Sequence, residues 1–213
     1  MTATGSSVPG ARLRRLAQRP REIPPELQEH CELCSEAIPA EHRHLVNLES
    51  GELLCACRPC TILFDRHEAG GNHYRLVPER RTHLADFDLD DLVWEELRIP
   101  VDMAFFFRST HAGRVVALYP GPMGATESLL ELEAWEAMEA ANPPLRELEP
   151  DVEALLVNRA KGARDYWVVP IDECYRLVGV IRTGWRGLTG GREVWEEIER
   201  FFEALDDKST RKG

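Results

Sequence analysis

Four hydrophobic runs in the second half of the chain predict β-strands. The runs AFFFRS, RVVALYP, VEALLVNR and DYWVVPI are rich in β-branched and aromatic residues, which favour the pleated surface of a sheet. Turns around residues 111–113 and 161–162 separate the runs into two pairs. The glycines and prolines of residues 120–124 predict a loop after the second run. This arrangement indicates strands joined as antiparallel hairpins.

Apolar residues at helical spacing predict four helices beside these strands. The first lies within residues 86–99, with Asp86 or Asp88 as its N-cap and Pro100 as its end. The second runs from an N-cap at Ser128 to Ala141. The last two have apolar faces made of Ile171, Cys174, Tyr175, Val178 and Ile181, and of Val194, Trp195, Ile198, Phe201, Phe202 and Leu205. Residues 81–206 are therefore predicted to form an α+β domain with an antiparallel sheet and C-terminal helices.

The residues before 81 follow a different pattern, in which short apolar runs alternate with prolines and cysteines. HLVNL and ELLCA predict two short strands around a turn at 49–51, and Pro59 suits the first turn of a helix that opens within CRPC. We expect residues 28–80 to form a metal-binding module that is zinc-ribbon or treble-clef-like. Residues 1–27 are expected to be a disordered lead-in or, at 11–18, a basic helix, and residues 207–213 a disordered tail.

The cysteines of this module have the spacing of a metal site. CELC, with Cys31 and Cys34, is followed after 22 residues by CRPC, with Cys57 and Cys60. Each CxxC pair presents two sulfurs to one ion, and two such pairs complete a tetrahedral shell around zinc. The alternative is that these cysteines are inert buried thiols of the core, but it gives no reason for five of them, including Cys55, to lie so close together in the chain. The sequence therefore predicts a closed, structural tetrathiolate site.

Two features of the cluster leave alternatives open. Cys55 can replace Cys57 or Cys60 as a ligand, and otherwise it is a core-facing strand residue or a spare thiol beside the metal. Iron at the same four sulfurs would make the module a rubredoxin-like electron carrier. Zinc is favoured because Ser35 and Thr61 follow the two CxxC pairs, where rubredoxin-like sites usually have glycine.

The histidines His42 and His44 allow a third interpretation, since they lie on the expected hairpin between the cysteine pairs. This arrangement resembles, in part, the treble-clef nucleases of the HNH type, which would imply a metal-dependent hydrolase with an open coordination position. The match lacks an Asp-His pair before the hairpin and a histidine after the second CxxC. We expect the two histidines to support the metal site or lie at the surface.

Composition narrows the partners and the compartment. The formal net charge of -11 argues against binding to nucleic acid or to an anionic membrane. The arginines within 12–21 form a local basic stretch, interpreted as a solvated tail. No run approaches the roughly 20 apolar residues that span a bilayer, and polar, proline-rich residues follow Arg14-Arg15 where an export signal needs an apolar segment. Paired CxxC units also suit a reducing compartment, so a soluble, cytoplasmic protein is expected.

The larger domain offers no recognisable catalytic motif. WRGLTGG at 185–191 is glycine-rich and precedes a helix, but it lacks the lysine of a phosphate-binding loop. We interpret it as a connection in which Gly190 and Gly191 adopt unusual dihedrals and Trp185 packs on the core. Asp172 is expected to be a helix N-cap, and Cys174 an inert core residue.

Two longer segments carry a family resemblance. CELCSEAIPAEHRHLVNLESGELLCACRPC at 31–60 and PIDECYRLVGVIRTGWRGLTGGREVWEEIERFF at 170–202 resemble a bacterial protein family encoded beside actinobacterial-type, high-affinity nickel-iron hydrogenases. The resemblance implies an accessory role in hydrogenase maturation or operation, with a hydrogenase subunit or a maturation factor as partner. It brings no catalytic residues. The sequence thus predicts a zinc-stabilised, non-enzymatic accessory protein that binds another protein.

Overall fold

A seven-stranded sheet forms the centre of the protein in its computed structural model, which describes residues 28–64, 73–187 and 190–212. The strand order is β10-β4-β9-β8-β5-β6-β7. The strands are β4 (Thr82–Leu84), β5 (Met103–Ser109), β6 (Arg114–Gly121), β7 (Gly124–Ser128), β8 (Glu153–Asn158), β9 (Asp165–Pro170) and β10 (Thr210–Lys212). Neighbouring strands are antiparallel except β10 and β4, which are parallel. The four strands predicted from hydrophobic runs correspond to β5, β6, β8 and β9.

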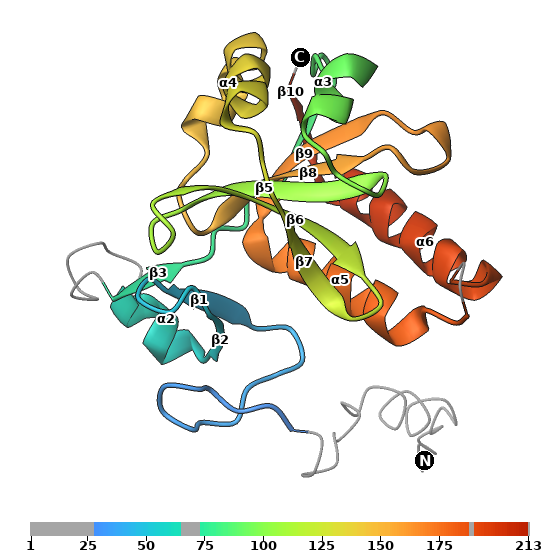
Figure 1. Cartoon of the computed structure of the whole chain (residues 1–213). Helices are drawn as coiled ribbons and strands as arrows, with labels where there is room; N and C mark the ends of the chain where they lie inside the picture. The colour runs from blue at the N-terminus through green and yellow to red at the C-terminus, as the bar shows by residue number, and fades with distance from the viewer. Residues whose placement is uncertain (1–27, 65–72, 188–189, 213) are drawn as a thin grey trace, which may run out of the picture.

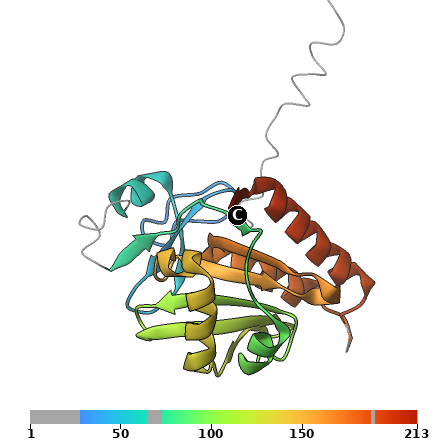
Figure 2. The same cartoon turned by 90° about the horizontal axis from the view of Figure 1, so that it is seen from above.

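Helices cover both faces of this sheet (Figure 1). Helices α5 (Ile171–Gly184) and α6 (Arg192–Lys208) pack on one face. On the other lie α3 (Asp91–Glu96), α4 (Leu132–Ala141) and the short 3-10 helix η2 (Pro143–Glu147). Figure 2 shows the same layers from above. The fold is α+β, as predicted from the sequence.

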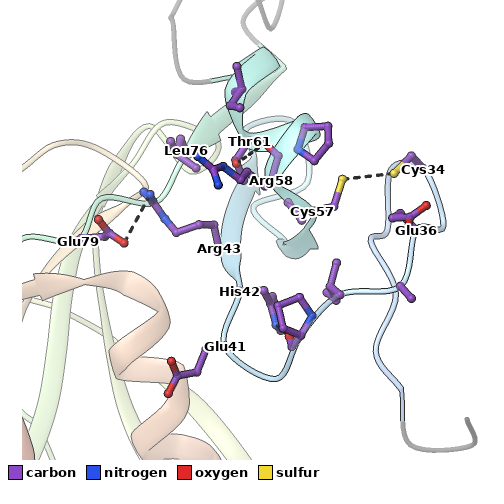
Figure 3. A pocket seen from close by; sticks show the side chains of 16 residues that line it. Cys34, Glu36, Glu41, His42, Arg43, Cys57, Arg58, Thr61, Leu76 and Glu79 are labelled. Carbon is purple, nitrogen blue, oxygen red and sulfur yellow. Dashed lines mark hydrogen bonds and ion pairs between the residues drawn. The ribbon is translucent and has the colours of Figure 1, made fainter. Parts of the chain in front are cut away.

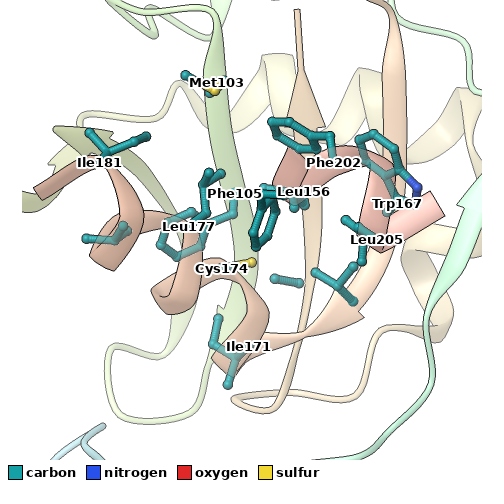
Figure 4. Packing of buried hydrophobic residues seen from close by; sticks show 14 of the residues in the cluster. Met103, Phe105, Leu156, Trp167, Ile171, Cys174, Leu177, Ile181, Phe202 and Leu205 are labelled. Carbon is teal, nitrogen blue, oxygen red and sulfur yellow. The ribbon is translucent and has the colours of Figure 1, made fainter. Parts of the chain in front are cut away.

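The alternation of side chains along the central strands explains why both faces need a cover. In β8, Ala154 and Leu156 join the core under α5 and α6, whereas Leu155 and Val157 join the core under α3 and α4. Successive residues of a strand point to opposite faces, so a continuous apolar run places apolar side chains on both. Figure 4 shows the first of these cores, with Phe105 and Leu156 from the sheet beside Leu177 of α5.

A smaller unit precedes the large sheet. Its three-stranded sheet has the order β2-β1-β3, with β1 (Arg43–Asn47), β2 (Leu53–Ala56) and β3 (Tyr74–Leu76) all antiparallel. Helix α2 (Arg58–Phe64) follows β2. The hairpin turn at 49–51 and the helix after CRPC were both predicted. Val46 and Val77 are buried in the same apolar core as Phe105 and Val152, so the small unit packs directly against the larger domain.

Two predicted helix starts were wrong, and in each case a neighbouring segment explains the difference. Helix α3 begins at Asp91 with Asp90 as N-cap, whose carboxylate accepts a hydrogen bond from the Val93 amide at 2.8 Å. At Asp88 the carbonyl, which in an N-cap residue would accept the first intrahelical hydrogen bond, instead accepts one from the Asn142 side-chain amide at 2.8 Å. The N-cap of α4 is Glu131, because Ser128 ends β7 instead.

Several short strands were not predicted at all. Residues 120–124, expected to be a loop, form the tight turn between β6 and β7, with Gly121 opposite Gly124. Residues 210–212, expected to be a disordered tail, form β10, where the Thr210 amide donates to the Arg81 carbonyl at 2.9 Å.

The expected helix at 11–18 lies outside the described residues. Gly190 and Gly191 do have positive φ angles, 86° and 80°, and Trp185 packs on the core.

Three ion pairs fasten the segment 75–81 to the larger domain. Each consists of an arginine of this segment and a nearly buried carboxylate, namely Arg75 with Asp151, Arg80 with Glu153 and Arg81 with Glu173. The three carboxylate side chains are 3–6% exposed. Burying a carboxylate is costly unless it is paired, so these arginines stabilise the packing of the two parts, together with Thr110 at Asp151 and Arg176 at Glu173.

Replacing Arg75 with methionine is expected to destabilise the protein by about 1–3 kcal/mol, because a buried carboxylate then loses a charged hydrogen-bond partner. Arg75 Nη1 lies 2.6 Å from the Pro150 carbonyl and 3.2 Å from Asp151 Oδ2. Urea unfolding followed by tryptophan fluorescence measures the loss. The matched control is Arg192→Met, whose side chain is 90% exposed and whose loss should stay within about 0.5 kcal/mol. Equal losses for both variants would contradict the assignment.

Candidate metal centre

The first cysteine pair lies in a tight turn before β1. The Cys31 amide donates to the Glu36 carbonyl and the Ser35 amide to the Cys31 carbonyl, both at 2.8 Å. Ser35 has a φ of 61°, in the left-handed region that closes such turns and that non-glycine residues rarely adopt. The turn presents both sulfurs toward the start of α2.

The second cysteine pair lies at the junction between β2 and α2. Cys57 immediately precedes the helix, and Cys60 lies in its first turn. The helix start is fixed by Thr61, whose amide donates to the Cys57 carbonyl at 3.0 Å and whose hydroxyl donates to the Arg58 carbonyl at 2.9 Å. Pro59 occupies a first-turn position where its missing N–H costs nothing. Hairpin and helix therefore bring the second pair to the first.

The sulfurs of Cys31, Cys34, Cys57 and Cys60 all lie within 4.8 Å of one another. The Cys34 and Cys57 sulfurs are 3.5 Å apart (Figure 3). Ligands of a tetrahedral ion with metal–sulfur bonds of about 2.3 Å are separated by about 3.8 Å, so the four sulfurs fit such an ion. All six cysteines of the chain are free, and the four thiols remain available as ligands.

The environment of the cluster opposes ionisation of several thiols at once. Burial disfavours the Cys31 thiolate, but hydrogen bonds from the backbone amides of Cys57, Leu33 and Cys34 outweigh it and lower the pKa of Cys31 to about 6. Burial, followed by hydrogen bonds with the neighbouring thiols, raises the pKa of Cys60 well above its usual range. A divalent cation at the centre would supply the positive charge that lets all four ligands ionise.

Cys55 stands apart from these four sulfurs. It is half-buried and packs against the small cluster of Cys31, Ile38, Cys57 and Cys60. Burial, together with the Glu32 and Glu29 carboxylates, raises the pKa of Cys55. Its sulfur lies near His42 and His44, which form with it a second group of possible metal ligands. Both histidines are thus grouped with Cys55 and not with the four-cysteine cluster.

The predictions for two residues of α5, Cys174 and Asp172, had different outcomes. Cys174 is fully buried among apolar side chains (Figure 4), and burial raises its pKa well above the ordinary value, as an inert core thiol requires. Asp172 was predicted to be an N-cap, but α5 begins at Ile171 after Pro170. Asp172 instead accepts a hydrogen bond from His44 Nδ1 at 2.9 Å. No local pattern signals this contact, because it joins residues 128 positions apart.

A cavity of about 820 Å³ lies beside the cysteine cluster. Its walls include Cys34 and Cys57 on one side and the Arg43–Glu79 ion pair on the other (Figure 3). Ile62 of α2 also lines it and is 65% exposed, while the adjacent Leu63 is 60% exposed. The four-cysteine cluster thus adjoins an accessible surface with apolar side chains.

Fold and site together define an α+β protein with a four-cysteine cluster able to hold a metal ion. The chain belongs to DUF5947, a family of unknown function, whose model matches residues 30–209. No curated protein and no solved structure matched the chain. Within the described ranges, no helix has the length and apolar character needed to cross a membrane.

Replacing Cys31 with serine is expected to release the metal and to unfold the hairpin and α2. The reason is that the binding energy of a structural ion, roughly 10–16 kcal/mol in zinc-finger peptides, is also folding energy. Metal content after dialysis against a chelator and hydrogen exchange at residues 43–64 measure the two effects. All five tryptophans lie at position 94 or beyond, so their fluorescence reports separately on the larger domain.

Cys55→Ser is the matched control for this substitution, because it makes the same change on β2 outside the four-sulfur group. It should keep the metal through the same dialysis. A Cys31→Ser protein with a full equivalent of metal and unchanged hydrogen exchange would show that the cluster is not the metal centre.

Proposed function

We propose that this protein is a zinc-stabilised, non-enzymatic accessory protein that binds another protein through the surface next to its four-cysteine cluster. The observation that carries the proposal is the position of Ile62 and Leu63. They are exposed on α2, the helix that begins within the second cysteine pair. Large exposed apolar side chains beside a cavity are typical of protein contact sites.

The proposed role of the metal is structural. Four thiolates complete a tetrahedral shell and leave no position for water or substrate. The cluster ties the turn at 31–34 to β2 and α2, and so fixes the orientation of the helix that carries the exposed pair. This arrangement supports binding over metal-dependent hydrolysis at the same ion.

Iron at the four sulfurs is the main alternative, and it would make the protein an electron carrier. Ser35, where rubredoxin-like sites usually have glycine, does not keep backbone amides away from the Cys34 sulfur, because the Glu36 amide forms a hydrogen bond to it. The identity of residue 35 therefore does not discriminate between zinc and iron. Zinc is preferred because sites that join a hairpin to a helix start are typical structural zinc sites.

Protein purified without added metal is expected to contain one equivalent of zinc and to be colourless, because zinc has a filled d shell. Elemental analysis and the visible absorption spectrum check this. One equivalent of iron, with thiolate-to-iron absorption in the visible, would establish the electron-transfer alternative instead.

The partner that we propose is a subunit or a maturation factor of a nickel-iron hydrogenase. The support is the resemblance of residues 31–60 and 170–202 to a family encoded beside such enzymes. The Ile62-Leu63 pair and the adjoining cavity would form the contact. The Arg43–Glu79 ion pair at the cavity would form part of the polar rim that usually surrounds the apolar centre of a protein–protein interface.

The double substitution Ile62→Asp with Leu63→Asp is expected to weaken binding to the hydrogenase partner by about 30-fold or more, since a buried apolar anchor contributes roughly 2 kcal/mol. Co-purification of hydrogenase subunits with the tagged full-length chain, followed by titration calorimetry, measures it. Leu92→Asp is the matched control, because Leu92 is 71% exposed but lies on α3 of the larger domain.

Both variants must first be shown to keep their metal and their tryptophan fluorescence. Equal binding by the double variant and the wild type would exclude α2 as the contact. A wild-type chain that binds no hydrogenase subunit or maturation factor would exclude the proposed partner.

A further inference from the structure

Three potential metal ligands lie together on the β1–β2 hairpin, outside the four-cysteine cluster. The ligand atoms of His42, His44 and Cys55 all lie within 4.8 Å of one another. The reason lies in the strand register, because His44 stands directly opposite Cys55 in the antiparallel pair. His42 precedes His44 by two residues, which places it on the same face of an extended chain. The two imidazole rings are 4.8 Å apart.

Each histidine is held by a hydrogen bond at only one of its ring nitrogens. His44 Nδ1 lies 2.9 Å from Asp172 Oδ2, and His42 Nδ1 lies 3.0 Å from the Pro39 carbonyl. Metal-ligating histidines usually donate their other ring N–H to a carboxylate or a backbone carbonyl, which fixes the tautomer and orients the ring. Both histidines therefore have the support that ligands need.

The second ring nitrogen of His42, Nε2, is available to bind a metal ion. His42 Nε2 is buried and has no hydrogen-bond partner among the residues that the structure describes. Buried polar atoms are nearly always paired, and an imidazole nitrogen without its own proton can be paired by a metal ion. The buried Asp172 Oδ1 is also without a hydrogen-bond partner among the described residues.

We propose that His42, His44 and Cys55 form a second metal site, which binds a divalent transition-metal ion such as Zn²⁺. Two imidazoles and one thiolate are a ligand set that occurs in such sites, and three protein ligands leave one position of a tetrahedral ion for water or another small ligand. His42 and His44 also line a cavity of about 700 Å³ at the junction with α5. The site would therefore be open, in contrast to the closed four-cysteine cluster.

The second site goes beyond the accessory function proposed above and does not depend on it. Cys55 lies between the two sites, since its side chain packs against the four-cysteine cluster and its backbone forms hydrogen bonds with Glu32. Its carbonyl accepts a hydrogen bond from the Glu32 amide at 3.0 Å, and its amide donates to the Glu32 carboxylate at 2.6 Å. Its sulfur belongs to the histidine group. This arrangement gives the fifth cysteine of the cluster a role of its own.

Co²⁺ is the probe for this site, because its bond to a thiolate gives a charge-transfer band in the near ultraviolet and its coordination is close to that of zinc. The full-length chain, with the metal with which it was purified, is titrated with Co²⁺ alone while the first metal is assayed. We expect one further equivalent of cobalt to bind without release of the first metal. Cys55→Ser should abolish the charge-transfer band, and His42→Ala or His44→Ala should lower the cobalt affinity by about 100-fold or more.

Asp172 is a positioning residue, and Asp172→Asn tests that role separately. The variant should keep the charge-transfer band at saturating Co²⁺ but bind it about 10–100-fold more weakly. His111→Ala is the control, because His111 is exposed on the turn between β5 and β6, and its affinity should equal that of the wild type. Tryptophan fluorescence verifies that each variant is folded.

Three results would overturn the proposal. The first is a wild-type chain that binds no second equivalent of cobalt. The second is cobalt binding that survives all three ligand substitutions. The third is loss of the originally bound metal from Cys55→Ser, which would place Cys55 in the four-cysteine centre.

Discussion

Three buried ion pairs between the segment 75–81 and the larger domain are the contacts on which the arrangement of this protein depends. They join Arg75 within β3, and two arginines after that strand, to carboxylates before and at the start of β8 and in the first turn of α5. The pairs are Arg75 with Asp151, Arg80 with Glu153 and Arg81 with Glu173. Carboxylates this deeply buried are stable only when they are paired. The pairs therefore fix the small sheet on the larger domain.

The two parts of the molecule are stabilised in different ways. The larger domain has a sheet that is apolar on both faces, with two extensive cores. Among the described residues, the core around the cysteines has Cys31, Ile38, Cys57 and Cys60 as its buried apolar side chains, a set too small to hold the first cysteine turn and α2 together by itself. A metal ion at the four sulfurs would supply the missing stability.

Local pattern was sufficient wherever an element has its own hydrophobic period. The β1–β2 hairpin, α2, the strands β5, β6, β8 and β9, and the helices α5 and α6 all follow such periods. Strands β3, β4, β7 and β10 were missed because their sequences, YRL, THL, GATES and TRK, contain no apolar run that would mark a strand. They exist because a neighbouring strand offers unpaired backbone groups, as β4 does for β10. The N-caps of α3 and α4 were predicted wrongly because of tertiary contacts as well. Asp88 is bound by the Asn142 side chain, and Ser128 belongs to β7.

The sequence by itself determined the α+β class and the four cysteines that meet in one cluster, because a CxxC turn and a helix start are local structures whose spacing is written in the chain. Only the tertiary structure decided the position of Cys55. Its register opposite His44 places its sulfur with the two histidines, and the packing of β1 against α5 brings Asp172 behind them. These contacts join residues 11 to 128 positions apart. Such distant pairs are set by sheet register and by the pairing of buried charges, and no periodicity along the chain encodes them.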